Sequence, residues 1–119
     1  MEWKIDKQRP ICPQLCEQIC VLIASGEIAA GAKLFSVREV ALEAGVNPNT
    51  VQKSFEELER YGLIYSVRGT GWFVREETQT AKEIVAGLIK NKTKEYFESM
   101  NQLGVDTDGI KKYVEEWSE

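Results

Sequence analysis

The chain has 119 residues, a formal net charge of −4, and 43% hydrophobic and 29% charged side chains. These values are close to the globular average, so they exclude a collagen-like fibre and a wholly disordered chain and allow one compact domain or one small domain with an appendage. Histidine is absent, which excludes histidine-dependent catalytic triads and removes the commonest neutral metal ligand and general base.

Neither a leader nor a membrane span is predicted. Glu2, Lys4 and Asp6 follow the first methionine without an apolar stretch, and no apolar run approaches the roughly 20 residues that a membrane-spanning helix needs. We therefore expect a cytoplasmic protein without a membrane partner.

Charge is unevenly distributed along the chain. Residues 1–75 carry nine basic and nine acidic side chains, whereas residues 76–119 carry six basic and ten acidic side chains. Because phosphate binding depends on Lys and Arg, a polyanionic partner is expected to meet the first part.

Two helical patterns lie between residues 11 and 45. Residues 11–23 repeat apolar side chains at helical spacing, and Gly26 is suited to end that helix. Ser36 and Glu39 form a Ser-x-x-Glu capping box, in which each side chain satisfies a backbone amide of the other residue. A second helix is therefore expected to begin at Ser36 and to end at Gly45 after about two turns.

A third helix is predicted directly after this glycine turn. Asn47 suits the N-cap, and Pro48 suits the first helical position, where its missing N–H costs nothing. The helix is expected to end at Gly62 and to direct four apolar side chains to a core, namely Val51, Phe55, Leu58 and Tyr61.

A β-hairpin and two further helices are predicted to follow. Residues 63–67 and 72–74 are β-favouring runs on either side of a four-residue tip, residues 68–71. A helical pattern then runs from residue 77 to Gly104, and Asp106 is suited to cap a last helix. The expected fold is mainly α with a small hairpin: a winged helix-turn-helix over residues 8–76 and a two-helix segment over residues 77–119.

The second segment is too apolar for a helical pair of its size, so we expect it to form a symmetric dimer. An alternative is that some of its aromatic side chains line a ligand pocket, and the existence of a small-molecule effector stays open. The residues assigned to dimerisation are Ile84, Leu88, Tyr96, Phe97, Met100, Leu103, Tyr113 and Trp117.

Three motifs resemble the GntR family of bacterial transcriptional regulators. They are residues 34–41, residues 45–51 and residues 68–74, and the resemblance covers about residues 8 to 76. The helical remainder is similar to the small YtrA-type subgroup, which usually lacks a large ligand-binding domain and often controls transporter genes. The resemblance implies a DNA-binding regulator, expected to be a repressor, that acts as a homodimer on a pseudo-palindromic operator with recognition helices about 34 Å apart.

The resemblance also implies which residues meet DNA. Arg38 and the start of the third helix would face the major groove, and the wing tip would approach the minor groove. Two positions depart from the family pattern: Phe35 stands where Pro is common, and Pro48 where Arg is common. The predicted DNA-binding residues are Ser36, Arg38, Asn47, Pro48, Asn49, Thr50, Gln52, Lys53, Arg68, Gly69 and Thr70.

These residue types suit the chemistry of base reading. Asn can bind adenine through two hydrogen bonds, and Thr can contact a thymine methyl group. Arg38 has no acidic residue three or four positions ahead of it, which favours contact with phosphate or guanine over an ion pair within its helix. The alternative for Asn47 and Thr50 is helix capping alone. Lys33, Lys53 and Arg75 are interpreted as contacts to the DNA backbone or as ordinary solvated side chains.

Cys12, Cys16 and Cys20 recur every four residues on one stripe of the first helix. Packing at the edge of the core is the simplest interpretation, because a free cysteine behaves as a small apolar side chain. A thiol-responsive regulator that uses this stripe is an alternative, whereas metal binding lacks a fourth ligand. No metal or cofactor is expected.

Two other functional classes are weighed against the DNA-binding regulator. A winged-helix module that binds protein would agree with the negative net charge, and it predicts little DNA binding even at low salt. An enzyme is not expected, because the sequence shows no nucleophile–base pair and no metal signature.

Overall fold

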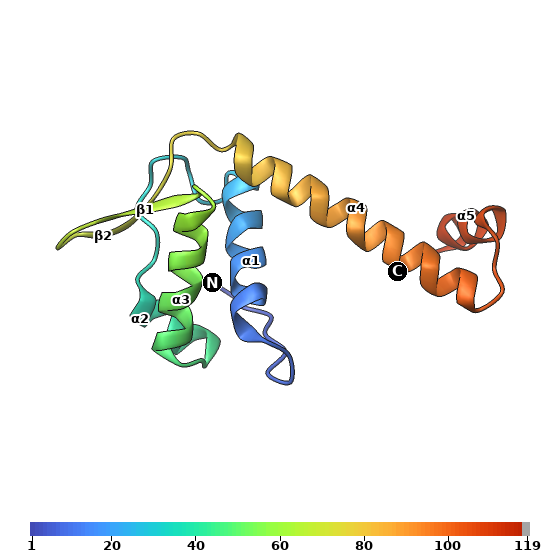
Figure 1. Ribbon diagram of the computed structural model, residues 1–119, viewed down its shortest axis with the longest axis horizontal. Helices are drawn as coiled ribbons and strands as arrows, with labels where there is room; N and C mark the ends of the chain where they lie inside the picture. Colours follow the sequence, from blue (N-terminus) through green and yellow to red (C-terminus); the bar gives the residue numbers. More distant parts are fainter. Residues whose placement is uncertain (118–119) are drawn as a thin grey trace. The chain divides into compact units, whose positions relative to one another are not determined.

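The computed structural model describes residues 1–117 and divides them into two compact units, which are considered separately below. The first unit is Met1–Val85, and the second begins at Ala86. Figure 1 shows the elements in chain order: α1 (Ile11–Ser25), α2 (Val37–Ala44), α3 (Pro48–Arg60), β1 (Ile64–Val67), β2 (Gly71–Val74), α4 (Gln79–Gln102) and α5 (Thr107–Glu116). This order confirms the predicted winged helix-turn-helix.

The helix ends lie where the local signals predict them. α1 is followed by Gly26 and α2 by Gly45, both with positive φ, a conformation that only glycine adopts readily. The side chain of Asp106 accepts a hydrogen bond from the amide of Gly109 at 2.8 Å and begins α5.

The capping box at the start of α2 is complete. The Ser36 hydroxyl accepts a hydrogen bond from the Glu39 amide at 3.1 Å, and the Glu39 carboxylate accepts one from the Ser36 amide at 3.1 Å. These hydrogen bonds hold the pKa of Glu39 below its ordinary value. The stabilisation by this carboxylate is therefore present above the pKa of an unfolded glutamate and is lost as the pH falls through the lowered pKa.

Ser36→Ala is expected to lower the free energy of unfolding by about 1 kcal/mol, because the Glu39 amide loses its acceptor. Urea denaturation followed by circular dichroism measures this loss. Ser66→Ala, at an exposed position of β1, is the matched control and should leave the stability nearly unchanged. Equal effects of the two substitutions would contradict a stabilising cap.

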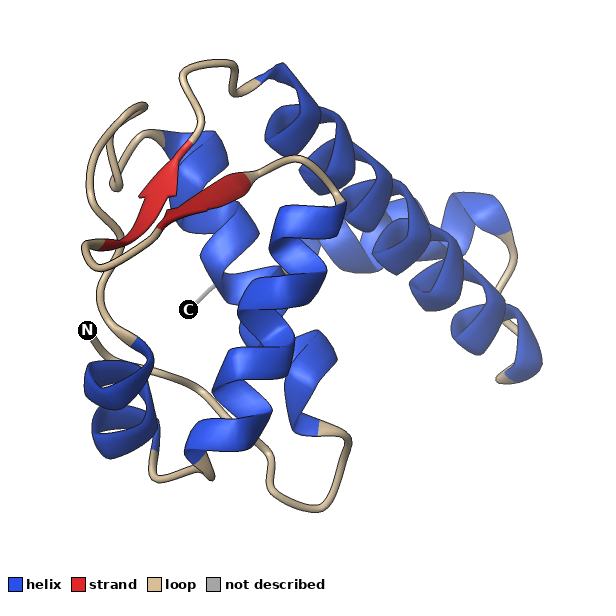
Figure 2. Cartoon of the chain, turned by 60° about the vertical axis from the view of Figure 1, so that its left-hand side comes forward, coloured by secondary structure: helices blue, strands red, loops and turns tan. Residues whose placement is uncertain are grey.

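The wing differs from the sequence prediction in two details. β1 and β2 are antiparallel with Val67 opposite Gly71, so the tip has three residues, 68–70, and not four. Residues 31–34 also pair with β2: the Leu34 amide donates to the Trp72 carbonyl at 2.8 Å, and Lys33 forms a bridge with Phe73. This third segment was not predicted, because its four residues show no strand alternation. Figure 2 shows the two strands beside the helices of this unit.

The core of the first unit is built by α1, α2, α3 and the wing. Leu15 and Ile19 of α1 and Val51, Phe55 and Leu58 of α3 are all buried, and the Phe55 ring meets the Trp72 ring edge-on. Tyr61, expected in this core, is instead 53% exposed. It follows the last helical residue, and the Arg60 guanidinium lies over its ring on the surface.

The first ten residues form an ordered segment, here called the N-terminal arm (residues 1–10), for which the sequence shows no local signal. The Trp3 indole donates to a Glu43 carboxylate oxygen at 3.2 Å and meets the Phe35 ring edge-on at 5.3 Å. Phe35, at the position where proline is common in the resembling family, thus packs between the arm and the core.

The second unit consists of the later part of α4 and of α5, joined by a turn at Gly104. Ile110 is fully buried, whereas Leu103 and Trp117 are 78% and 74% exposed. The beginning of α4 belongs to the first unit: Ala81 is buried in its core, and Ile84 and Val85 pack against it. The unit boundary therefore lies later than residues 76–77. Within residues 1–117, no helix is both long and apolar enough to cross a membrane.

Candidate nucleic-acid interface

The first turn of α3 is an exposed polar surface. Asn47, Pro48 and Asn49 are all exposed, and Thr50 is half-buried. The Asn47 side-chain oxygen accepts a hydrogen bond from the Asn49 amide at 2.8 Å, so Asn47 is the N-cap of α3, as the sequence predicted. The Asn49 side chain has no capping function, which leaves both its donor and its acceptor available to a base edge.

The helix begins with a charge distribution that suits DNA. Gln52 and Lys53 are exposed one turn beyond the cap, whereas Glu56, Glu57 and Glu59 stand in the later half of α3. The amide N–H groups of the first turn carry the positive end of the helix dipole, which adds to the charge of Lys53. The beginning of α3 is therefore favourable to an anion, and its end is not.

Arg38 extends from the first turn of α2 and is exposed. Within residues 1–117 its guanidinium has no ion-pair partner. Ser36 is also exposed, but its hydroxyl is engaged in the capping box. A planar guanidinium without an internal partner can bind a guanine edge or a phosphate through two hydrogen bonds.

The wing tip is a short turn that presents Arg68, Gly69 and Thr70 to solvent. The Thr70 amide donates to the Val67 carbonyl at 2.9 Å, and Gly69 has a φ of 78°, which a side chain would strain. The exposed Arg75, interpreted from the sequence as a contact to the DNA backbone or a solvated side chain, places its guanidinium 5.2 Å from the centre of the Tyr65 ring.

The cysteine stripe has the properties of core packing. Cys16 donates to the Ser54 carbonyl at 3.4 Å, and the buried Cys20 donates to the Ala81 carbonyl at 3.6 Å. Burial, followed by the effects of Cys12 and Glu57, raises the pKa of Cys16 to about 12, and burial also raises the pKa of Cys20. Among residues 1–117, no group of His, Cys, Asp and Glu side chains is arranged to hold a metal ion. These features do not favour a thiol sensor.

We expect Cys16 and Cys20 of the folded protein to react much more slowly than a free cysteine with an aromatic disulfide reagent at about pH 8. The thiolate is the reactive form, and a raised pKa leaves little of it at that pH. Absorbance of the released thiol measures the rate, and the urea-unfolded chain, in which all three thiols should react quickly, is the control. If all three cysteines of the folded protein react quickly, the result would support the thiol-responsive alternative.

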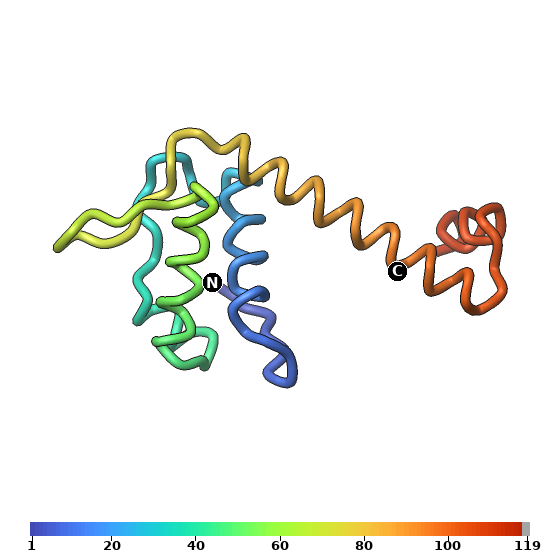
Figure 3. The backbone as a smooth tube through the Cα atoms, in the orientation of Figure 1, coloured from blue at the N-terminus to red at the C-terminus, as the bar shows by residue number. Residues whose placement is uncertain are grey.

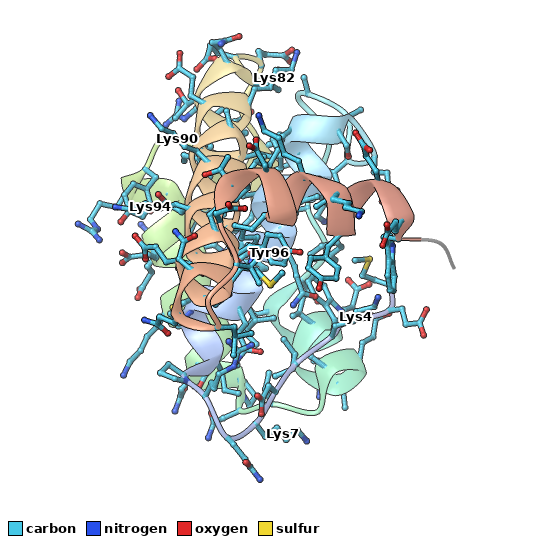
Figure 4. The ribbon with its side chains drawn as sticks, turned by 90° about the vertical axis from the view of Figure 1, so that its right-hand side faces the viewer. Lys4, Lys7, Lys82, Lys90, Lys94 and Tyr96 are labelled. Carbon is cyan, nitrogen blue, oxygen red and sulfur yellow. The ribbon has the colours of Figure 1, made fainter. Side chains whose placement is uncertain are left out.

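The second unit carries two neighbouring apolar grooves of about 620 and 510 Å³. Tyr96 and Val114 line both, with Phe97 in the first and Met100, Tyr113 and Trp117 in the second. Figure 4 shows Tyr96 between α4 and α5. The grooves thus bring together five of the residues assigned to dimerisation, whereas Ile84 packs against the core of the first unit.

Comparisons with known proteins agree with this geometry. Residues 13–74 match the model of the family described as "Bacterial regulatory proteins, gntR family". The chain is 33% identical to the uncharacterized HTH-type transcriptional regulator YhcF of Bacillus subtilis, over 97% of this chain and 98% of that protein. It is 36% identical to the HTH-type transcriptional repressor YtrA of the same organism, over 92% of this chain and 85% of that protein.

Solved structures show the same relationship. A GntR family transcriptional regulator from Listeria monocytogenes superposes with a TM-score of 0.85 at 34% identity, over 96% of this chain and all of that one. The DNA-binding domain of AraR in complex with its operator ORX1 superposes with a TM-score of 0.56 at 30% identity, over 62% of this chain and 98% of that one. This chain belongs to the gntR family of bacterial regulatory proteins and is a DNA-binding transcriptional regulator.

Proposed function

We propose that the chain is a homodimeric repressor that binds a pseudo-palindromic operator through the first turn of α3, Arg38 and the wing tip. The observation that carries this proposal is the exposed first turn of α3, where Asn49, Gln52 and Lys53 stand free of the core. Only the beginning of a recognition helix reaches base edges in the major groove, so polar side chains are needed at this place.

Each side chain of the interface has a separate role in the proposal. Asn49 and Gln52 read base edges, Arg38 binds guanine or phosphate, and Lys53 contacts the backbone. Arg68 enters the minor groove beside Gly69 and Thr70, where a narrow groove concentrates negative potential. Ser36, Asn47 and Pro48 place the beginnings of α2 and α3, and Thr50 lies at the edge of the contact surface.

Dimerisation is proposed to occur through the second unit. Four apolar side chains around the two grooves are exposed, and two more, Phe97 and Met100, are half-buried. The exposed ones are Tyr96, Tyr113, Val114 and Trp117. A second copy of the same surface would cover them around a two-fold axis, and a two-fold dimer matches two inverted half-sites. Leu88 and Leu103 belong to the same proposed surface.

Repression is proposed from the similarity to YtrA, which is named a transcriptional repressor. The mechanism needs no catalytic step and no cofactor, because the dimer would block transcription by occupying its operator. Since bacterial DNA lies in the cytoplasm, the proposal places the protein there. Control of transporter genes, expected from the resemblance to the YtrA-type subgroup, belongs to the same proposal.

A salt titration tests the DNA-binding surface. Fluorescence anisotropy with a duplex from the promoter of the chain's own gene measures affinity between about 0.05 and 0.2 M salt. Two subunits that each neutralise several phosphates should give a log–log slope steeper than about −4. A flat profile, or no binding at the lowest salt, would instead support the alternative of a protein-binding winged-helix module.

A further inference from the structure

The N-terminal arm is held in one place by the side chains of α1. Gln18 accepts a hydrogen bond from the Lys4 amide at 3.1 Å and donates to the Lys4 carbonyl at 2.8 Å. Gln14 does the same for Asp6, at 2.8 and 2.9 Å. Two glutamines thus pair with the arm backbone as a neighbouring strand would, and Figure 3 shows the arm turning back before α1 begins. The backbone of the arm at Lys4 and Asp6 is therefore held against α1.

The three basic residues of the arm differ in what surrounds them. Lys4 is exposed, and Arg9 is paired with Asp6 at 3.1 Å. Lys7 is exposed, and within residues 1–117 its ammonium group has no ion-pair or hydrogen-bond partner. Lys4 likewise has no ion pair within the described part of the chain, so the place of Lys7 in the fold distinguishes the two lysines.

The Lys7 ammonium lies against the turn of the helix-turn-helix. Its nitrogen is 3.2 Å from the place that a Cβ on Gly45 would occupy. Gly45 ends α2 and is followed after one residue by Asn47, the cap of α3. Figure 4 shows Lys7 at the end of the first unit where this turn lies, and Lys82 at the opposite end. An unmatched cation therefore stands beside the beginning of the recognition helix.

We propose that the N-terminal arm is part of the DNA interface, with Lys7 binding a backbone phosphate next to the α2–α3 turn. This inference rests on the proposed operator-binding surface and extends it to a segment outside the residues that match the family model, 13–74. A phosphate is the ligand that fits, because a single flexible ammonium supplies charge without the planar geometry that selects a base. Trp3, held by Glu43 and Phe35, ties the arm to α2 and so keeps Lys7 beside the turn.

A structural role for Lys7 has to be separated from DNA contact. α2 has no basic residue in its last turn, and a cation at a helix C-terminus stabilises that helix. Removal of this effect lowers the stability of the protein but does not change the number of counterions that DNA binding releases. The salt dependence of DNA binding therefore distinguishes the two roles.

The test compares Lys7→Gln with Lys82→Gln, which removes the same charge from an exposed position of the same unit. With the promoter duplex, Lys7→Gln is expected to weaken binding roughly three- to tenfold at about 0.1 M salt. It should also make the slope of log affinity against log salt concentration shallower by about 2, because a dimer would lose one phosphate contact in each of two half-sites. Lys7→Arg, which keeps the charge, should restore both values, and Lys82→Gln should change neither.

Two outcomes would overturn this inference. If Lys7→Gln lowers the thermal midpoint but leaves affinity and salt slope unchanged, Lys7 only stabilises α2. If Lys82→Gln has an equal effect on binding, the loss reflects net charge and not a contact. Arg38→Ala is measured in the same assay, because it should weaken DNA binding whether or not the arm contacts DNA. If Arg38→Ala weakens binding and Lys7→Gln does not, the arm proposal fails while the proposed operator-binding surface stands.

Discussion

Tyr96→Glu is expected to convert the proposed dimer into monomers and to weaken operator binding by roughly 100-fold or more. Tyr96 lines both apolar grooves of the second unit and is 41% exposed. A glutamate at this place would have to lose its water in the dimer interface without gaining a partner, which opposes association. Each subunit would then bind a half-site alone, without the high effective concentration that a linked partner provides.

Sedimentation at micromolar concentration measures the oligomeric state, and fluorescence anisotropy measures operator affinity. Tyr61→Glu is the matched control, because Tyr61 is an exposed tyrosine of the first unit outside the grooves. It should remain dimeric and bind as tightly as the unchanged chain. A Tyr96→Glu protein that stays dimeric, or that is monomeric but keeps full affinity, would contradict dimerisation through the second unit.

Arg38→Ala should weaken operator binding by about 1–3 kcal/mol without lowering the free energy of unfolding. The guanidinium is exposed and has no ion-pair partner within residues 1–117, so its removal leaves no buried group unsatisfied. Arg38→Lys separates the two possible ligands of this side chain. Lysine retains the charge for a phosphate, but it lacks the planar pair of donors that binds a guanine edge.

Arg60→Ala provides the control for Arg38, because Arg60 is an exposed arginine at the C-terminal end of α3, outside the proposed DNA surface. Urea denaturation and anisotropy should be run on all three variants. If the Arg38→Ala protein binds the operator as tightly as the Arg60→Ala protein, Arg38 is not part of the interface. The role of α3 would then still be tested by substitution of Asn49.

Local signals were sufficient to predict the helix-turn-helix. The capping box at Ser36, the cap at Asn47 and the glycines at 26 and 45 act within a few residues, and each is found where the sequence placed it. The exposure of Arg38 and Asn49 follows from the same pattern, because the apolar residues of their helices define which face is buried.

Features that depend on contacts between distant residues were not predictable in this way. The bond from Trp3 to Glu43 and the pairing of residues 31–34 with β2 leave no periodic pattern in the sequence. The packing of Ile84 against the first unit was likewise not predicted, because the sequence pattern continues without a break along the single helix α4. The place of Lys7 beside Gly45 was also not predicted from the sequence. It depends on hydrogen bonds between the N-terminal arm and α1, which join residues that are not neighbours in the sequence.

The surface that begins at Asn47 is most directly tested by selecting bound fragments from a pool of random duplex DNA and sequencing them. The proposed dimer predicts an enriched motif of two inverted half-sites whose centres are about one helical turn apart. Selection with Asn49→Ala should relax the preference at one base pair in each half-site, at symmetric positions. A pool without an enriched motif, or a motif that Asn49→Ala leaves unchanged, would contradict base reading by the first turn of α3.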